Sequence, residues 1–219
     1  MKNIFIVDDH PLTIDAYRNL LKSELDNIKE FVCAQNGNET ITKISNLSHN
    51  KENLDLAIID YNIPADSTGI IKNGSDVAKY IQNFYPDCKL VFLTMHNEPL
   101  IVQNLHLKYK PEGIISKNDI DFESFPIIIK DIIEGKFYRS ATMIEGLKQL
   151  MIRNINFDEI DSQILLLLSN KIKNKDLPNY INLSQSAIEK RKQKIKYQII
   201  GDKGSDKELL EAAKSFKLI

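Results

Sequence analysis

Hydrophobic residues in the first part of the chain form short unbroken runs that alternate with stretches of helical spacing. The runs predict strands at Asn3–Val7, Phe31–Ala34, Leu56–Ile59, Lys89–Leu93 and Gly113–Ser116. Between them, the apolar spacing predicts helices over residues 11–25, 38–47, 77–84, 100–107 and 122–134. Strands without polar alternation, separated by amphipathic helices, are typical of a doubly wound α/β domain with a five-stranded parallel sheet buried on both faces.

The last part of the chain has no strand-like run. Its spacing predicts helices over residues 142–151, 160–168, 174–180, 184–199 and 207–216. In the longest helix, Ile188, Ile195 and Ile199 share the buried face. The basic residues expected on its exposed surface are Lys190, Arg191, Lys192, Lys194 and Lys196. We therefore expect an α/β domain at residues 1–136, a linker with one helix at 137–154, and a small all-α domain at 155–219.

Composition supports two modules. Of the 219 residues, 42% are hydrophobic and 27% are charged, which is ordinary for a soluble globular protein. Residues 1–154 carry 17 Lys and Arg against 21 Asp and Glu, whereas residues 155–219 carry 12 against 9. A basic tail after an acidic domain indicates a second module that faces phosphates. No apolar run approaches the roughly 20 residues of a membrane span, so we expect a cytoplasmic protein with no membrane partner.

Polar side chains stand where the predicted strands end. Asp8 and Asp9 follow the first strand, Asp60 follows the third, Thr94 follows the fourth, and Lys117 follows the fifth. Because parallel strands end at one edge of a sheet, these side chains should converge. Two adjacent acids repel each other unless a cation lies between them, and Mg²⁺ prefers carboxylate oxygens. The Asp60 carboxylate is then placed to accept a phosphoryl group, a transfer that depends on positioning and charge neutralisation.

The motifs at these strand ends resemble those of receiver domains in bacterial response regulators. They are Val7-Asp8-Asp9-His10-Pro11, Ile59-Asp60 followed by Pro64, Leu93-Thr94-Met95-His96, and Ile115-Ser116-Lys117. The tail resembles a LuxR-type helix-turn-helix, so the whole chain is similar to the NarL/FixJ class of two-component transcription factors.

The resemblance assigns a role to each residue of the site. It implies that Asp8, Asp9 and Asp60 bind Mg²⁺ together with the backbone carbonyl of Asn62. It implies that Asp60 takes phosphate from a cognate sensor histidine kinase, while Thr94 and Lys117 contact the phosphoryl group. It further implies that phosphorylation favours a homodimer, which binds double-stranded promoter DNA.

Two departures from the receiver pattern affect this interpretation. Gly74 stands further from Asp60 than the matching glycine of the family does, which implies an insertion within Ala65–Asn73. The insertion either alters phosphate lifetime and partner choice or is a solvent-facing loop, and we favour the loop. Ile114 stands where the family usually has Tyr or Phe. Coupling from Thr94 would then run through the backbone or through another side chain.

Residues 171–177, followed by 183–188, resemble the scaffold helix, the turn and the start of the recognition helix. The second helix of such a motif enters the major groove, while Lys and Arg hold phosphates. The residues expected at the DNA are Lys175, Ser184, Gln185, Ser186, Glu189, Lys190, Arg191, Gln193 and Lys194. The resemblance places base contacts at Glu189, Lys190 and Gln193. Pro178 replaces an alanine of the scaffold helix, which leaves the geometry of that helix open.

Two other functions fit part of the pattern. A Mg²⁺-dependent phosphohydrolase would also form an aspartyl-phosphate, but it needs an acid two residues after the nucleophile, where Asn62 stands. It also leaves the basic tail unexplained. A receiver that regulates through protein contacts alone would not need the full set of five residues. We therefore favour a phosphorylation-controlled DNA-binding transcription regulator over an enzyme.

Overall fold

The computed structural model describes residues 2–96, 98–201 and 204–219. The described residues form two compact units. One unit comprises Met1–Met95 and Tyr109–Ala141, and the other comprises His96–Lys108 and Thr142–Ile219.

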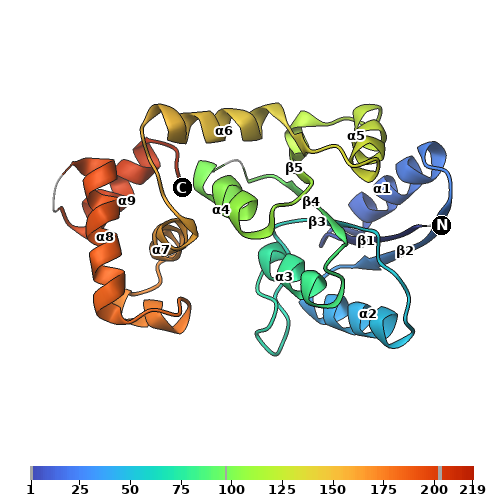
Figure 1. The fold of residues 1–219 in the computed structure, drawn as a ribbon, viewed down its shortest axis with the longest axis horizontal. Coiled ribbons are helices and arrows are strands. Elements are labelled where there is room, and N and C mark those ends of the chain that lie inside the picture. Colours follow the sequence, from blue (N-terminus) through green and yellow to red (C-terminus); the bar gives the residue numbers. More distant parts are fainter. Residues whose placement is uncertain (1, 97, 202–203) are drawn as a thin grey trace. The chain divides into compact units, whose positions relative to one another are not determined.

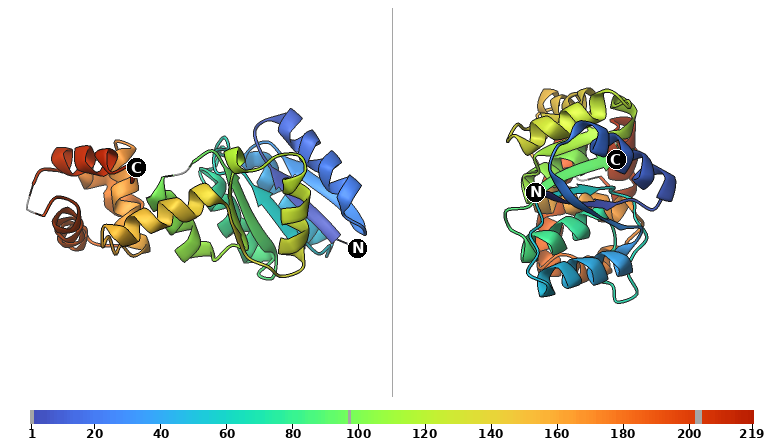
Figure 2. Two further views of the ribbon diagram at one scale, coloured as in Figure 1. Left: turned by 90° about the horizontal axis from the view of Figure 1, so that it is seen from above. Right: turned by 90° about the vertical axis from the view of Figure 1, so that its right-hand side faces the viewer.

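A parallel sheet forms the centre of the first unit. Its strands are β1 (Lys2–Val7), β2 (Ile28–Ala34), β3 (Leu56–Ile59), β4 (Lys89–Thr94), β5 (Gly113–Ser116) and β6 (Tyr138–Arg139), in the order β2-β1-β3-β4-β5-β6. The helices α1 (Pro11–Glu24) and α5 (Ser124–Ile133) cover one face, and α2 (Gly37–His49) and α3 (Gly74–Phe84) cover the other (Figures 1 and 2). The predicted doubly wound fold is confirmed.

Burial on both faces explains the unbroken hydrophobic runs. Ile4 and Ile6 of β1 pack in one cluster with Ile14 of α1 and Ile129 of α5. Phe5, which alternates with these residues along β1, is equally buried. A strand with both faces covered has no position where a polar side chain would reach water.

The predicted number of strands is wrong, because the sheet has six strands rather than five. β6 adds only two residues beside β5, where the Tyr138 amide donates to the Glu112 carbonyl at 2.8 Å. The Ser140 amide donates to the Ile114 carbonyl at 3.2 Å. Two residues are too few to show a strand pattern, and this segment was predicted as the start of the linker.

In the part that the structure describes, the second unit is all-helical around its own hydrophobic core. It contains most of α4 (Pro99–Tyr109), with α6 (Ala141–Ile152), α7 (Glu159–Ser169), the 3₁₀ helix η2 (Asn174–Asn179), α8 (Gln185–Ile200) and α9 (Asp206–Ser215). Buried residues from α7, α8 and α9, among them Leu165, Ile195 and Leu209, form the core. Among the described residues, no helix combines the length and apolar character needed to cross a bilayer.

Helix α4 joins this second core although its sequence lies within the predicted α/β domain. Leu100 is fully buried in the cluster, and its amide donates to the Leu218 carbonyl at 3.4 Å. The Asn104 side-chain amide donates to the Glu159 carbonyl at 3.3 Å. The compact units therefore divide the chain differently from the predicted ranges, whose boundaries stay a prediction.

The short helix predicted over residues 174–180 is a 3₁₀ helix, with Pro178 inside it. Proline cannot donate a backbone hydrogen bond, and its ring disfavours a continuing α-helix. The chain instead closes tightly, since the amides of Tyr180 and Ile181 both donate to the Leu177 carbonyl. Ser184 then caps α8 by accepting from the Ala187 amide at 3.3 Å, as predicted.

Candidate functional site

The acids and the lysine predicted at the strand ends meet in one cluster. Asp8 follows β1 and is 1% exposed, and Asp60 follows β3 and is 6% exposed. The Lys117 Nζ donates to Asp8 Oδ2 and to Asp60 Oδ2, each at 2.7 Å. Thr94 is buried at the end of β4, where it pairs with Ser116 of β5. The topology of the sheet thus brings Asp8, Asp60 and Lys117 together, as the sequence predicts, and places Thr94 at the end of the neighbouring strand β4.

Local structure fixes the two ends of this cluster. The Asp60 amide donates to the Val7 carbonyl at 2.9 Å, which ties β3 to β1 where both strands end. Lys117 begins a short 3₁₀ helix, η1 (Lys117–Asp119), and the Ser116 side chain caps it by accepting from the Asn118 amide. Both tethers hold the chain where the side chains must meet, so the site is preorganised.

The charges in the cluster do not balance. Burial raises the pKa of Asp60, while the hydrogen bond and the charge of Lys117 oppose that shift. Burial alone would lower the pKa of Lys117, but its hydrogen bonds to Asp60 and Asp8 outweigh burial and raise it. Two buried carboxylates thus share one ammonium group, and the surplus negative charge favours a further cation.

The residues present fit a magnesium ion. Ligand atoms of Asp8, Asp9 and His10 all lie within 4.8 Å of one another. Asp9 Oδ1 is buried and accepts no hydrogen bond from the residues that the structure describes, although the His10 Nδ1 lies 2.7 Å away. Hard cations take such carboxylate oxygens. Asn62 is exposed two residues after Asp60, and its backbone amide donates to Asp60 Oδ1 at 3.3 Å.

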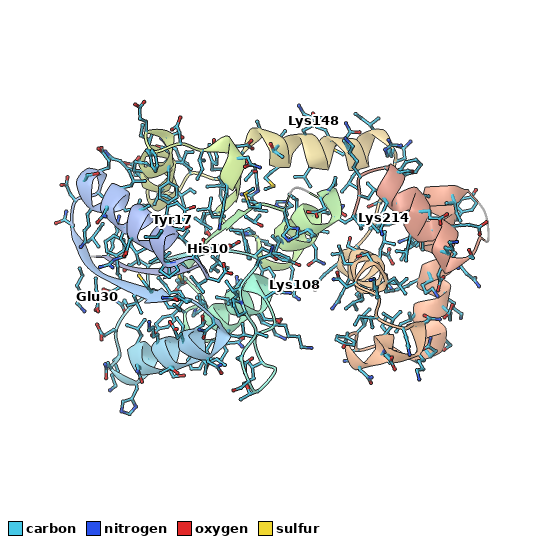
Figure 3. All side chains as sticks on the ribbon, turned by 180° about the vertical axis from the view of Figure 1, so that it is seen from behind. His10, Tyr17, Glu30, Lys108, Lys148 and Lys214 are labelled. Carbon is cyan, nitrogen blue, oxygen red and sulfur yellow. The ribbon has the colours of Figure 1, made fainter. Side chains whose placement is uncertain are left out.

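Tyr17 belongs to the electrostatic surroundings of this site, and the sequence interpretation missed it. Burial raises the pKa of Tyr17 to about 12. The charge of Lys117 opposes this shift, and the charge of Asp8 adds to it. Its ring lies 4.6 Å from that of Phe125, centroid to centroid. Figure 3 shows Tyr17 on α1 near His10. Its spacing from Ile14 and Leu21, three and four residues away, is the signal in the sequence that could have placed it on the inner face of α1.

The segment in which an insertion is predicted, Ala65–Asn73, is a folded loop. Asp66 is buried, and its carboxylate accepts from the amides of Thr68 and Ile71. The Gly37 amide at the start of α2 donates to the Pro64 carbonyl at 2.9 Å, and a Cβ at Gly37 would lie 2.6 Å from the Asp66 nitrogen. Residues 67–70 face solvent, whereas Asp66 and Ile71 anchor the loop.

Gly74 closes this loop against the backbone of Asp60. Its amide donates to the Tyr61 carbonyl at 2.8 Å, and a Cβ at Gly74 would lie 2.1 Å from the Asp60 carbonyl oxygen. We expect Gly74→Ala to destabilise the protein by about 3 kcal/mol, because the contacting atoms are backbone and cannot rotate away. Denaturant unfolding at equilibrium measures this loss.

The matched control is Gly69→Ala in the same loop. Gly69 has a φ of 78°, and among the described residues no atom beyond its chain neighbours would lie within 4 Å of an added Cβ, so only the left-handed backbone opposes alanine. That strain costs about 1 kcal/mol. Equal losses for the two variants would show that close approach to Asp60 is unimportant.

The residues predicted at the DNA fall into two groups. Exposed residues are Lys175, Ser184, Gln185, Ser186, Lys190, Gln193 and Lys194. Glu189 and Arg191 are half-buried. Glu189 accepts from the Asn174 side chain, and Arg191 pairs with Asp158 at 2.7 Å and Asp161 at 2.8 Å.

The predicted exposure of Lys192 is wrong. This side chain is buried, and its ammonium pairs with Asp206 at 2.7 Å. Lys196 is half-buried and pairs with the other oxygen of Asp206, also at 2.7 Å. Lys192 lies four residues after Ile188 and three before Ile195, so it belongs to the buried stripe of α8.

Comparison with known proteins identifies the family of the first part of the chain. Residues 4–125 match the family model of the response regulator receiver domain. The chain is 26% identical over 148 residues to the transcriptional regulatory protein RcsB of Salmonella typhi, covering 68% of this chain and 63% of RcsB. It is 25% identical over 159 residues to the transcriptional regulatory protein DegU of Brevibacillus brevis, covering 73% of this chain and 61% of DegU.

Solved structures show the same fold. RcsB from Salmonella enterica serovar Typhimurium, bound to promoter rprA with the phosphomimetic BeF3−, aligns with a TM-score of 0.66 and 22% identity, covering 98% of this chain and 100% of that one. The isolated REC domain of the same RcsB aligns with a TM-score of 0.55 and 25% identity, covering 67% of this chain and 98% of that one. The receiver fold predicted from the sequence is confirmed, and the chain belongs to the response regulator receiver domain family.

Proposed function

We propose that this protein is a phosphorylation-controlled DNA-binding transcription regulator. The observation that carries the proposal is the ammonium of Lys117 held between two buried carboxylates, Asp8 and Asp60. Such a cluster stores negative charge around a potential nucleophile and keeps a fixed cation beside it. The relatives named as transcriptional regulators, and a similar RcsB structure bound to promoter DNA, support the same function.

In this proposal Asp60 accepts a phosphoryl group from the phosphohistidine of a cognate sensor kinase. The N–P bond breaks as the carboxylate forms an O–P bond, and Lys117 remains beside the transferred group. Asp8, Asp9, Asp60 and the backbone carbonyl of Asn62 would hold Mg²⁺, which supplies positive charge to the phosphoryl oxygens. Thr94 would donate its hydroxyl to a phosphoryl oxygen. The chain acts as a regulator rather than as an enzyme with turnover.

Phosphorylation would change the protein through charge. It adds about −1.5 to −2 charge at Asp60, which attracts Lys117 and Thr94. We propose that the modified protein favours a homodimer, which presents two α8 helices to paired half-sites on duplex DNA. We further propose that residues 1–136 form the domain that receives the phosphoryl group, that residues 155–219 form the DNA-binding domain, and that residues 137–154 link the two.

The test is DNA binding with and without phosphodonor. Genomic fragments are incubated with the full chain, Mg²⁺ and acetyl phosphate, and the retained sequences are compared with those retained without acetyl phosphate. We expect defined sites whose affinity rises about 10-fold on phosphorylation, in the range of ordinary coupling between two sites. A protein that is phosphorylated at Asp60 and retains no DNA in either state would overturn the proposal.

A further inference from the structure

The basic residues of α8 are largely neutralised by acids of the same unit. Asp161 is fully buried and pairs with Arg191 at 2.8 Å and with Lys194 at 2.6 Å. Asp206 pairs with Lys192 and Lys196. Withdrawing these cations would leave a buried or partly buried carboxylate without its partner, which is costly. They are therefore poorly placed to hold phosphates.

Only Lys190 of the α8 cations has no ion-pair partner among the described residues. It is exposed on the same face as Ser186 and Gln193, four residues before it and three after. This face can enter a groove, but one free cation gives it little attraction for a polyanion. The phosphate contacts of a duplex must come largely from elsewhere.

A second group of lysines lies on the segment before α8. Lys171, Lys173 and Lys175 are all exposed, and none has an ion-pair partner within the part of the chain that the structure describes. With Asp176, Asn179 and Tyr180 they line a hollow of about 350 Å³. We call these three residues the η2 lysines. Asp176 is the one acid at the hollow, so positive charge predominates there.

The η2 lysines are fixed with respect to α8. Lys173 and Lys175 flank Asn174, whose side-chain amide donates to Glu189 of α8. Glu189 lies one residue before the free Lys190. In a helix-turn-helix, the first helix crosses the DNA backbone while the second lies in the groove. The η2 segment has the corresponding place before α8.

We propose that the η2 lysines bind the phosphate backbone of duplex DNA and supply most of the electrostatic affinity of this unit. Lys175 was expected at DNA from the sequence, whereas Lys171 and Lys173 were not. The inference rests on the proposed DNA-binding function and specifies which residues hold the backbone. α8 is left to read bases with a weakly charged face.

The backbone at Lys171 provides a clean variant. Lys171 follows the α7 cap Asn170 with a φ of 63°, and its amide donates to the Leu168 carbonyl at 3.0 Å. The next amide, of Ile172, donates to the Leu167 carbonyl at 3.1 Å. This is the Schellman arrangement, whose left-handed position favours glycine. Lys171→Gly therefore removes the charge while relieving backbone strain, and the variant should fold at least as well as the wild type.

Lys217 gives a matched control in the same unit. It has a φ of 54° after α9, and its amide donates to the Lys214 carbonyl in the same Schellman arrangement. Figure 3 shows Lys214 on α9, away from η2, the short segment between α7 and α8 in Figure 1. Lys217→Gly makes the same changes in charge and backbone, but outside the proposed contact.

The experiment measures the affinity of the full chain for a fluorescent 30-bp duplex (~100 Å long) of arbitrary sequence over a range of KCl concentrations. The slope of log affinity against log salt is negative, and removing one phosphate contact lowers its magnitude by about 0.9. We expect that decrease for Lys171→Gly, with a several-fold loss of affinity, and about three times that decrease for Lys171→Gly combined with Lys173→Gln and Lys175→Gln. Lys217→Gly should match the wild type.

The possible outcomes distinguish failure of this inference from failure of the proposed DNA-binding function. A wild-type protein that binds the duplex, with slopes unchanged in the η2 variants, overturns the inference but leaves DNA binding intact. Equal losses for Lys171→Gly and Lys217→Gly also overturn it, since total charge would then explain the effect. If the wild-type protein binds no duplex at low salt while Asp60 still accepts phosphate, the proposed DNA-binding function itself is wrong.

Discussion

Asp60→Asn is expected to lose phosphoryl incorporation, by at least about 100-fold, as when a nucleophile is removed from an enzyme. The amide lacks the negative charge that makes the carboxylate a nucleophile. The fold should survive, because an amide oxygen can still accept from Lys117 and one of two buried negative charges is removed. Intact-protein mass spectrometry after incubation with Mg²⁺ and acetyl phosphate measures the incorporation.

The control for this variant is Asp66→Asn. Asp66 is a buried aspartate of the same segment, 7% exposed against 6% for Asp60, but its carboxylate serves the loop. The Asp66→Asn protein should therefore still incorporate one phosphoryl group, at Asp60. Undiminished incorporation in Asp60→Asn, or equal loss in both variants, would remove Asp60 from its assigned role.

The convergence of Asp8, Asp60 and Lys117 could be predicted because topology forces it. Once the hydrophobic runs are assigned to parallel strands, their carboxyl ends share one edge, whatever the intervening loops do. The distances of 2.7 Å from the Lys117 Nζ to both carboxylates are one local result of this convergence. Sequence alone could not say that the insertion folds on Asp66, because a buried aspartate and a solvent-facing one look alike in a polar loop.

The errors at Lys192 and at β6 have different causes. Lys192 occupies a buried position of α8 by spacing, but its charge favoured exposure, and only the structure shows Asp206 beside it. β6 is held by pairing with β5 and has too few residues to show a pattern. The predicted domain ranges stay a prediction, but the grouping of α4 with the second core could not be seen in the sequence, because it depends on contacts such as Leu100 with Leu218, which lie far apart along the chain.

Lys117→Met is expected to destabilise the protein by about 3–5 kcal/mol, because it removes the one cation shared by two buried carboxylates. Denaturant unfolding without divalent cations measures the loss. Adding Asp8→Asn should recover part of it by removing one of the unpaired charges. Mg²⁺ should stabilise Lys117→Met more than the wild type, since a bound cation replaces the missing charge.

Lys136→Met separates this effect from the loss of any ion pair. Lys136 also contacts a carboxylate at 2.7 Å, that of Asp131, but both side chains are exposed. An exposed pair contributes about 0–1 kcal/mol, so this variant should unfold close to the wild type. The contrast tests whether burial makes Lys117 essential to a site of two acids. A Lys117→Met protein as stable as Lys136→Met would mean that the carboxylates are protonated or hydrated, and that the lysine is not what holds them together.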